Sequence, residues 1–158
     1  VTPAWLMTQA YGTGYDRLGD MHTDEMWARI SMASQQVMEK TPTRLLIPAG
    51  TAIQNARYTA LDRFGKAGHL VYDGYHLHEG IAPLIEGLCA AQVVMKHYGV
   101  DVDVEKSRLR ITPEWRKERR TPEPHGEPEP ATDEDYSLAY RSVKWALASP
   151  WQLTVIEK

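Results

Sequence analysis

Cysteine is almost absent from this sequence, since Cys89 is the only one in 158 residues. A single thiol excludes an internal disulfide and a zinc site built from several cysteines. No apolar run approaches the roughly 18 residues that cross a bilayer, so we expect no membrane-spanning segment. The net charge is −3 and the basic residues are scattered along the sequence. We therefore expect no basic surface that binds nucleic acids.

The N-terminus shows neither a signal peptide nor an initiating methionine, because the first residue is Val1. We therefore expect a chain that was processed or truncated before this residue. The rest of the composition, 42% apolar and 25% charged residues, is that of an ordinary globular protein. The length suits one domain or a part of one.

Short apolar runs alternate with helical patterns along the first hundred residues. Residues 5–11 and 45–47 are apolar runs that end at glycine or proline, which predicts buried strands. Thr23 is a suitable N-cap for a helix that ends before Pro42. Further helices are predicted at residues 51–61, from residue 81 to a cap at Gly99, and at 132–149. The predicted apolar face of the first helix comprises Met26, Ile30, Ala33 and Val37.

This alternation of strands and helices favours an α/β sandwich with a parallel sheet. Two clear strands are too few for such a sheet, so we interpret the chain as part of a larger unit. Residues 1–100 form the predicted α/β part. Residues 101–131 are predicted to be a charged and Pro/Glu-rich connector, of which residues 121–130 cannot bury a core. Residues 132–158 form a C-terminal helix and tail.

The feature with the clearest chemical meaning is the pair Asp73 and His76, three residues apart in a glycine-containing turn before a helix. An aspartate in this position can accept a hydrogen bond from Nδ1–H of the imidazole, which leaves Nε2 free to act as a base. The spacing alone is weak evidence. It is also compatible with a turn-capping aspartate beside a surface histidine. A metal site that includes His76, His78, Asp73 and Glu79 is a further alternative.

The sequence L-L-I-P-A-G-T-A-I-Q-N-A-R at 45–57, followed by D-G-Y-H-L at 73–77, resembles a bacterial branch of the SGNH/GDSL hydrolases. In that branch, a strand ends in an "IPxGTAIQ"-like segment and the last catalytic block reads "DGxHL". The likeness covers residues 4–98. It implies a three-layer α/β/α sandwich with about five parallel strands, incomplete in this chain. It also implies ester hydrolysis with His76 as the base and Asp73 as its orienting carboxylate.

The resemblance leaves the nucleophile outside this chain, because no G-D-S-like serine segment occurs. Four serines fall inside predicted helices, and Asn55 does not match the oxyanion asparagine of the family. The missing parts belong to an absent N-terminal half or to a partner chain, or the chain is a non-catalytic binding module. We expect a small-molecule or carbohydrate ester as substrate and no cofactor. The residues predicted to contact the substrate are Tyr11, Tyr15, Tyr75 and His78.

Overall fold

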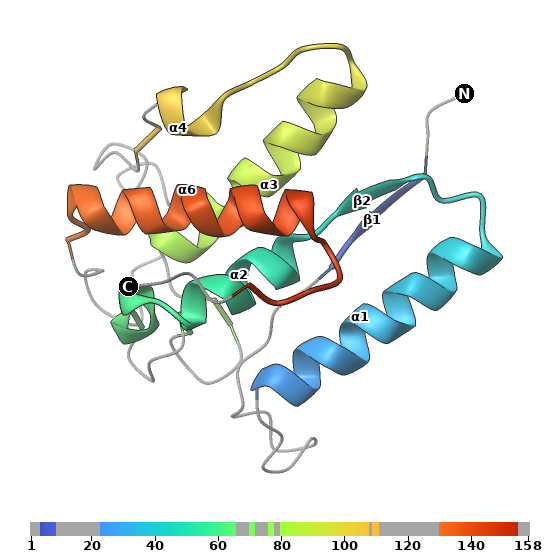
Figure 1. The fold of residues 1–158 in the computed structure, drawn as a ribbon, viewed down its shortest axis with the longest axis horizontal. Helices are drawn as coiled ribbons and strands as arrows, with labels where there is room; N and C mark the ends of the chain where they lie inside the picture. Colours follow the sequence, from blue (N-terminus) through green and yellow to red (C-terminus); the bar gives the residue numbers. More distant parts are fainter. Residues whose placement is uncertain are drawn as a thin grey trace, which may run out of the picture.

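The fold is described from a computed structural model, which places residues 4–8, 23–65, 70–71, 76–77, 80–107, 109–110 and 130–154. Two strands and several helices follow one another along these ranges (Figure 1). Their bounds are β1 Trp5–Met7, α1 Thr23–Lys40, β2 Leu45–Ile47, α2 Ala49–Arg57, the 3-10 helix η1 Ala60–Arg63, α3 Ile81–His97, α4 Val104–Ser107 and α6 Asp133–Ala148.

The two strands form a parallel sheet and are connected through α1. Trp5 pairs with Leu45 and Met7 with Ile47, so the segment β1-α1-β2 is a crossover unit of the kind that parallel strands require. The predicted α/β class and the parallel pairing are therefore confirmed. The predicted strand at residues 45–47 has the observed bounds. Of the predicted strand at 5–11, the described part is strand over Trp5–Met7.

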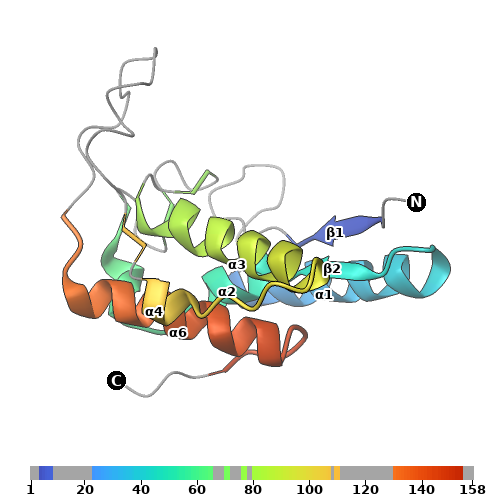
Figure 2. The same cartoon turned by 90° about the horizontal axis from the view of Figure 1, so that it is seen from above.

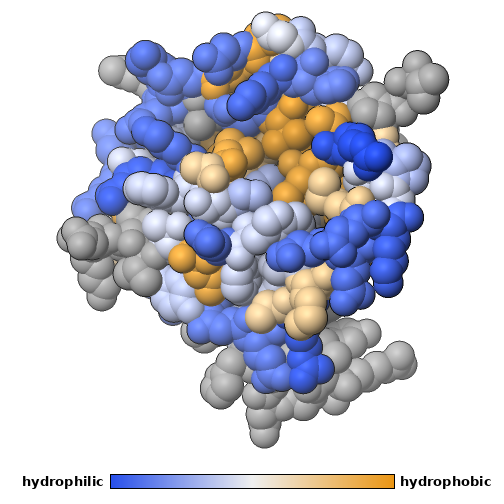
Figure 3. All heavy atoms as spheres, turned by 45° about the vertical axis from the view of Figure 1, so that its right-hand side comes forward, coloured by the Kyte–Doolittle hydropathy of each residue, from blue (hydrophilic) through white to orange (hydrophobic). Residues whose placement is uncertain are grey.

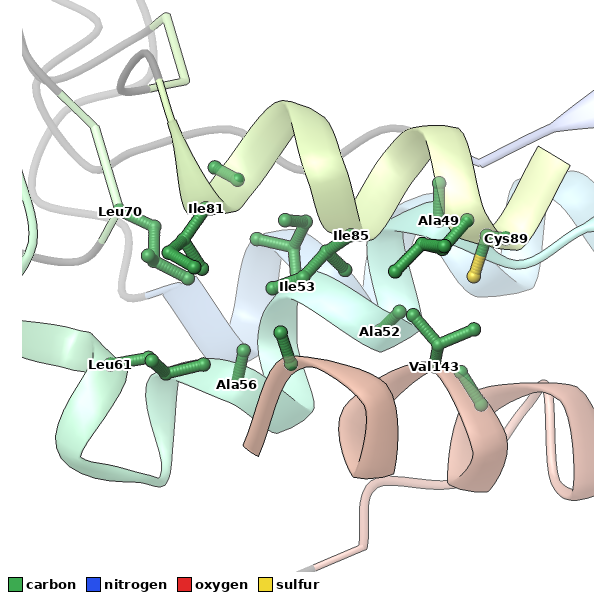
Figure 4. Packing of buried hydrophobic residues seen from close by; sticks show 14 of the residues in the cluster. Ala49, Ala52, Ile53, Ala56, Leu61, Leu70, Ile81, Ile85, Cys89 and Val143 are labelled. Atoms are coloured by element: carbon green, nitrogen blue, oxygen red, sulfur yellow. The ribbon is translucent and has the colours of Figure 1, made fainter. Parts of the chain in front are cut away.

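Helix α2 lies at the centre of the hydrophobic core, between α3 and α6 (Figure 2). Its alanines, Ala49, Ala52 and Ala56, are fully buried and allow close approach of the neighbouring helices. Ile53 of α2 projects toward α3 in Figure 4. Each large aliphatic side chain buried in such a core contributes about 1.5 to 3 kcal/mol. The same buried cluster includes residues from the other elements, among them Leu61, Leu70, Ile81, Ile85, Cys89, Leu138 and Val143.

Helix α2 is shorter than the helix predicted over residues 51–61. It ends at Arg57, and the 3-10 helix η1 begins at Ala60. Thr59 causes the break: its backbone is extended, and its side chain accepts a hydrogen bond from the N–H of Leu61. A threonine hydroxyl competes with helical hydrogen bonds in this way.

Helix α1 was predicted to bury the face that carries Met26, Ile30, Ala33 and Val37, and this prediction is wrong in part. Met26 is buried and Ile30 half-buried, but Ala33 is exposed and Val37 is 43% exposed. The helix buries Ser31 and Ser34 instead. The buried face is thus rotated from the apolar face by roughly a quarter of a turn, given the helical repeat of 3.6 residues.

Helix α6 joins the core through Ala139, Val143 and Ala146, all fully buried. The predicted inward positions Tyr136 and Leu147 also pack against the core, half-buried. Thr132 caps the helix reciprocally with Asp135: each side chain binds the backbone N–H of the other residue. Such a capping box stabilises a helix start by about 1 kcal/mol.

Candidate functional site

The candidate site lies around the loop that carries His76. Val71 and Leu77 form an antiparallel bridge, which closes the loop between them at its base. The side chain of His76 is exposed, whereas Val71 is buried and Leu77 half-buried. The apolar residues at the base thus anchor the loop, and the imidazole is presented at the surface.

A strained backbone supports the base of this loop. Leu70 is fully buried and has a φ of 61°, in the left-handed region that non-glycine residues rarely occupy. Its N–H donates to the carbonyl of Phe64 at 2.9 Å. Gly65 has a φ of 100°, and a Cβ there would lie 2.1 Å from the carbonyl oxygen of Val71. Strain of this kind is kept where the surroundings fix one conformation.

Helix α3 begins directly after the loop and holds its other end. Gly80, at the N-cap, has a φ of 122° and a ψ of −112°, a conformation open only to glycine at low cost. Ile81, Ala82 and Ile85 then enter the core. His76 is therefore held between the buried Val71 and the buried first turn of α3.

The direction of α3 shows on which side of the sheet His76 lies. The last residue of α3, His97, packs its ring against Trp5 at the start of β1, with the ring centroids 5.9 Å apart. A helix of 17 residues is about 25 Å long, so its first turn lies far beyond the carboxyl ends of β1 and β2. Figure 2 shows α3 running opposite to the strands. His76 thus lies on the carboxyl side of the parallel strands, where open α/β sheets bind their ligands.

The carboxyl ends of β1 and β2 are joined by Thr8, which is buried. Its N–H donates to the carbonyl of Ile47 at 3.0 Å, and its Oγ1 accepts from the N–H of Gly50 at 3.0 Å. The N–H of Gly50 also lies 3.1 Å from the carbonyl of Thr8. The start of α2 is therefore tied to the end of β1 on the carboxyl side of the two strands.

A row of buried polar side chains lies along α2. Thr51 accepts a hydrogen bond from Nε1 of Trp27 at 3.0 Å and donates to the carbonyl of Pro150 at 2.7 Å. Oδ1 of Asn55 accepts from the N–H of Thr154 at 2.9 Å. These contacts bind α1 and the segment after α6 to the same helix.

Gln54 is the centre of this row. Its Nε2 donates to Thr23 at 3.0 Å and to Asp24 at 2.6 Å, and its Oε1 accepts from Nη1 of Arg57 at 2.8 Å. Burial lowers the pKa of Arg57 to about 10, while the nearby carboxylates of Asp62 and Asp24 act in the opposite direction. Arg57 therefore keeps its charge at neutral pH inside the protein. The row acts as a structural clamp between α1 and α2.

Of the predicted site residues, His76 lies among the described residues, shortly before a helix as predicted, and its side chain is exposed. Five others lie outside the described residues, so the pairing of Asp73 with His76 stays a prediction. They are Asp73, Tyr11, Tyr15, Tyr75 and His78.

Three of the described serines are too buried to act as a nucleophile. Ser31 and Ser34 are buried in α1, and Ser142 is fully buried in α6, where its hydroxyl donates to the carbonyl of Leu138. Cys89 is fully buried as well, and its burial together with the nearby Glu86 raises the pKa of the thiol to about 12. A thiol of this kind is inert.

Within the described ranges, no group of three or more His, Cys, Asp or Glu side chains is suited to a metal ion. Those ranges also contain no helix that is long and apolar enough to span a membrane.

The row of buried polar residues on α2 was not predicted from the sequence. Its signal was the sequence T-A-I-Q-N-A-R, in which polar residues interrupt a helix of alanines and an isoleucine.

The family model of a domain of unknown function, DUF4886, matches residues 7–109. The chain belongs to the DUF4886 family. The match includes the His76 loop, α2 and α3. A crystal structure at 1.50 Å of a DUF4886 family protein from Bacteroides uniformis ATCC 8492 is similar, with a TM-score of 0.71 and 21% sequence identity. The similarity covers 98% of this chain and 51% of that chain. No curated protein matches the sequence.

The likeness to the Bacteroides uniformis DUF4886 protein extends beyond the family match to the C-terminal helix, because nearly the whole chain is aligned. At 21% identity it establishes a shared fold. This chain spans about half the length of that relative.

Proposed function

We propose that this DUF4886 chain carries the acid-base half of a serine ester hydrolase of the SGNH type. The observation that carries the proposal is the position of His76. Its imidazole is exposed on a bridged loop at the start of α3, on the carboxyl side of two parallel strands. This is where an open α/β sheet places its reacting groups. The full fold would be a three-layer α/β/α sandwich of about five parallel strands.

In the proposed reaction, His76 Nε2 removes the proton of a serine hydroxyl while the serine oxygen attacks the acyl carbon of an ester. Asp73 accepts the Nδ1–H hydrogen bond and stabilises the imidazolium. The proton then passes to the leaving alcohol, and an acyl-enzyme is formed. Water, deprotonated by His76, attacks the acyl-enzyme and releases the carboxylic acid and the free serine.

We place the nucleophile of this reaction outside residues 1–158, because the sequence has no G-D-S-like serine segment. Ser31, Ser34 and Ser142 are moreover buried in helices. Tyr11, Tyr15, Tyr75 and His78 are the residues we propose to contact the substrate. A small acyl ester, such as an acylated carbohydrate, is the substrate class that the family resemblance favours.

The test uses the natural polypeptide that contains residues 1–158, with a fluorophosphonate probe and 4-nitrophenyl acetate. We expect one labelled serine and measurable ester hydrolysis. His76→Ala should lower kcat/KM by at least about 1,000-fold, because the general base is lost. The matched control is His97→Ala, which removes an exposed histidine from the other end of α3 and should retain activity.

Thermal unfolding of both variants would show that their folds are intact, since both side chains are exposed. Retained turnover in His76→Ala would remove this histidine from the mechanism. Loss of activity on addition of a chelator, without labelling of any serine, would favour the alternative metal-dependent hydrolase.

A further inference from the structure

One edge of β1 has no partner strand among the described residues. The side that faces β2 is identified by two contacts: the carbonyl of Ala4 accepts from the N–H of Leu45, and the N–H of Thr8 donates to Ile47. Backbone groups of alternate residues point to opposite edges of a strand. The N–H and C=O groups of Trp5 and Met7 therefore point away from β2, toward an open edge.

An open edge of this kind is unusual for a parallel sheet. Parallel strands occur almost only in sheets that are covered on both faces, and a sheet of two short strands has little stability of its own. The three residues of β1 are only half-buried, although all three are apolar. The strand has the apolar composition of an interior strand, but among the described residues its environment is that of an edge.

The apolar face of α1 lacks a partner in the same region of the fold, among the residues that the structure describes. Ala33 and Val37 share a face with the buried Met26 and the half-buried Ile30, yet both are exposed. The face lies beside the buried side of the helix rather than opposite to it, because the two are about a quarter of a turn apart. A neighbour packed against this flank would cover the apolar face completely.

Figure 1 places β1 and α1 on the same side of the molecule, and Figure 3, which brings that side forward, shows apolar residues at the surface. The relative from Bacteroides uniformis shares the fold over nearly all of this chain, but the shared part is only 51% of that relative. The rest of that chain is thus about as long as the shared part, which is enough for further strands and helices.

We propose that the open edge of β1 and the apolar face of α1 form an internal interface for the other half of the DUF4886 fold. That half is a segment of the same polypeptide outside residues 1–158. It adds a strand beside β1 and packs apolar side chains against Ile30, Ala33 and Val37. The inference rests on packing alone and is independent of the proposed chemistry.

The test compares the chain of residues 1–158 with the full natural polypeptide that contains it. Val37→Cys introduces a thiol into the interface, and Met32→Cys is the matched control. Met32 is 57% exposed and lies on the opposite side of α1. The natural thiol, Cys89, is fully buried and adds little background. We expect maleimide to label Val37→Cys at least about 10-fold more slowly in the full polypeptide, because burial limits thiol access. Met32→Cys should react equally fast in both proteins.

A second measurement needs no substitution. Hydrogen exchange at the amides of Trp5 and Met7 should slow in the full polypeptide, since a new strand would accept their hydrogen bonds. Equal labelling and equal exchange in the two proteins would overturn the proposal. So would a natural polypeptide with no further segment. Slower labelling and slower exchange of residues 1–158 alone at higher protein concentration would overturn it too, because a second copy of the chain would then cover the edge. Because neither readout involves ester hydrolysis, the interface and the proposed function can fail separately.

Discussion

The guanidinium of Arg63 makes two hydrogen bonds to the carboxylate of Asp135, with Nη1–Oδ1 at 2.8 Å and Nη2–Oδ2 at 2.7 Å. The pair joins η1, which follows α2, to the first turn of α6. The same carboxylate accepts from the N–H and the hydroxyl of Thr132, each at 2.8 Å. One buried side chain therefore caps α6 and docks it on the centre of the fold.

Asp135→Asn should destabilise the protein by about 2 to 3 kcal/mol. The substitution weakens the capping box and removes the negative charge to which the two guanidinium nitrogens of Arg63 bind. Urea unfolding measures this change. The control is Asp133→Asn in the same turn. The side chain of Asp133 is 97% exposed and pairs with Arg110 at 3.0 Å, so its loss should cost less than about 0.5 kcal/mol. Equal costs for the two variants would contradict a special role for Asp135.

The stability of the protein should also decrease at acidic pH through Asp135. Burial tends to raise the pKa of this carboxyl, but the hydrogen bonds from Arg63 and Thr132 outweigh it and keep the pKa below the ordinary value of 3.8. A carboxyl with a lowered pKa in the folded state stabilises fully above its unfolded pKa. The contribution is lost as the pH falls from 3.8 through the lower folded pKa. Urea unfolding from about pH 6 to about pH 2.5 should show a steeper acid loss in the wild type than in Asp135→Asn.

Much of the local structure could be predicted from the sequence, because it depends on short-range patterns. The strand at Leu45–Ile47 is a buried apolar run, and α3 follows from apolar spacing that begins at Ile81. The position of His76 shortly before a helix was also predicted. These features depend on periodicity and on proline and glycine signals within a few residues.

The packing between distant segments could not be predicted in this way. The hydrogen bonds from Thr51 to Pro150 and from Thr154 to Asn55 each join residues 99 positions apart. Nothing in local periodicity indicates such pairs. The wrong prediction for α1 has a similar cause: the sequence shows an apolar face with Ala33 and Val37, but which face is buried depends on the neighbours present.

Gln54→Ala should loosen α1 from α2. The substitution removes the donors to Thr23 and Asp24 and takes away the acceptor that Gln54 offers to Nη1 of Arg57 in the interior. Loss of a partner for a buried polar group costs about 1 to 3 kcal/mol, so we expect a loss of about 2 to 4 kcal/mol in the free energy of unfolding. Gln36→Ala, at an exposed position of α1, is the control and should change stability by less than about 0.5 kcal/mol.

Hydrogen exchange can locate the effect of Gln54→Ala. The amides in the first turns of α1 should exchange faster in the variant, since Thr23 and Asp24 lose their link to α2, whereas those of α3 should change less. A uniform increase in exchange rate along the whole chain would indicate a general loss of stability. It would contradict the proposal that Gln54 holds α1 against α2.

Gly65→Ala and Gly87→Ala form a matched pair that tests the support of the His76 loop. Gly65 has a φ of 100°, and a methyl group added there would lie 2.1 Å from the carbonyl oxygen of Val71, so the site has no room for it. At Gly87, in the middle of α3, a Cβ would meet nothing within 4 Å. Gly65→Ala should therefore destabilise by at least about 2 kcal/mol, and Gly87→Ala should stabilise by about 0.5 to 1 kcal/mol.

The same pair separates stability from the geometry of the site. Because the Val71–Leu77 bridge closes the loop that carries His76, displacement of Val71 by Gly65→Ala should also displace the imidazole. Ester hydrolysis by the natural polypeptide, measured well below the melting temperature of the variant, should then fall in kcat, while Gly87→Ala leaves it unchanged. If Gly65→Ala lowered the melting temperature but kept full kcat, the strained turn would serve the fold alone, and the position of His76 would be fixed by the first turn of α3.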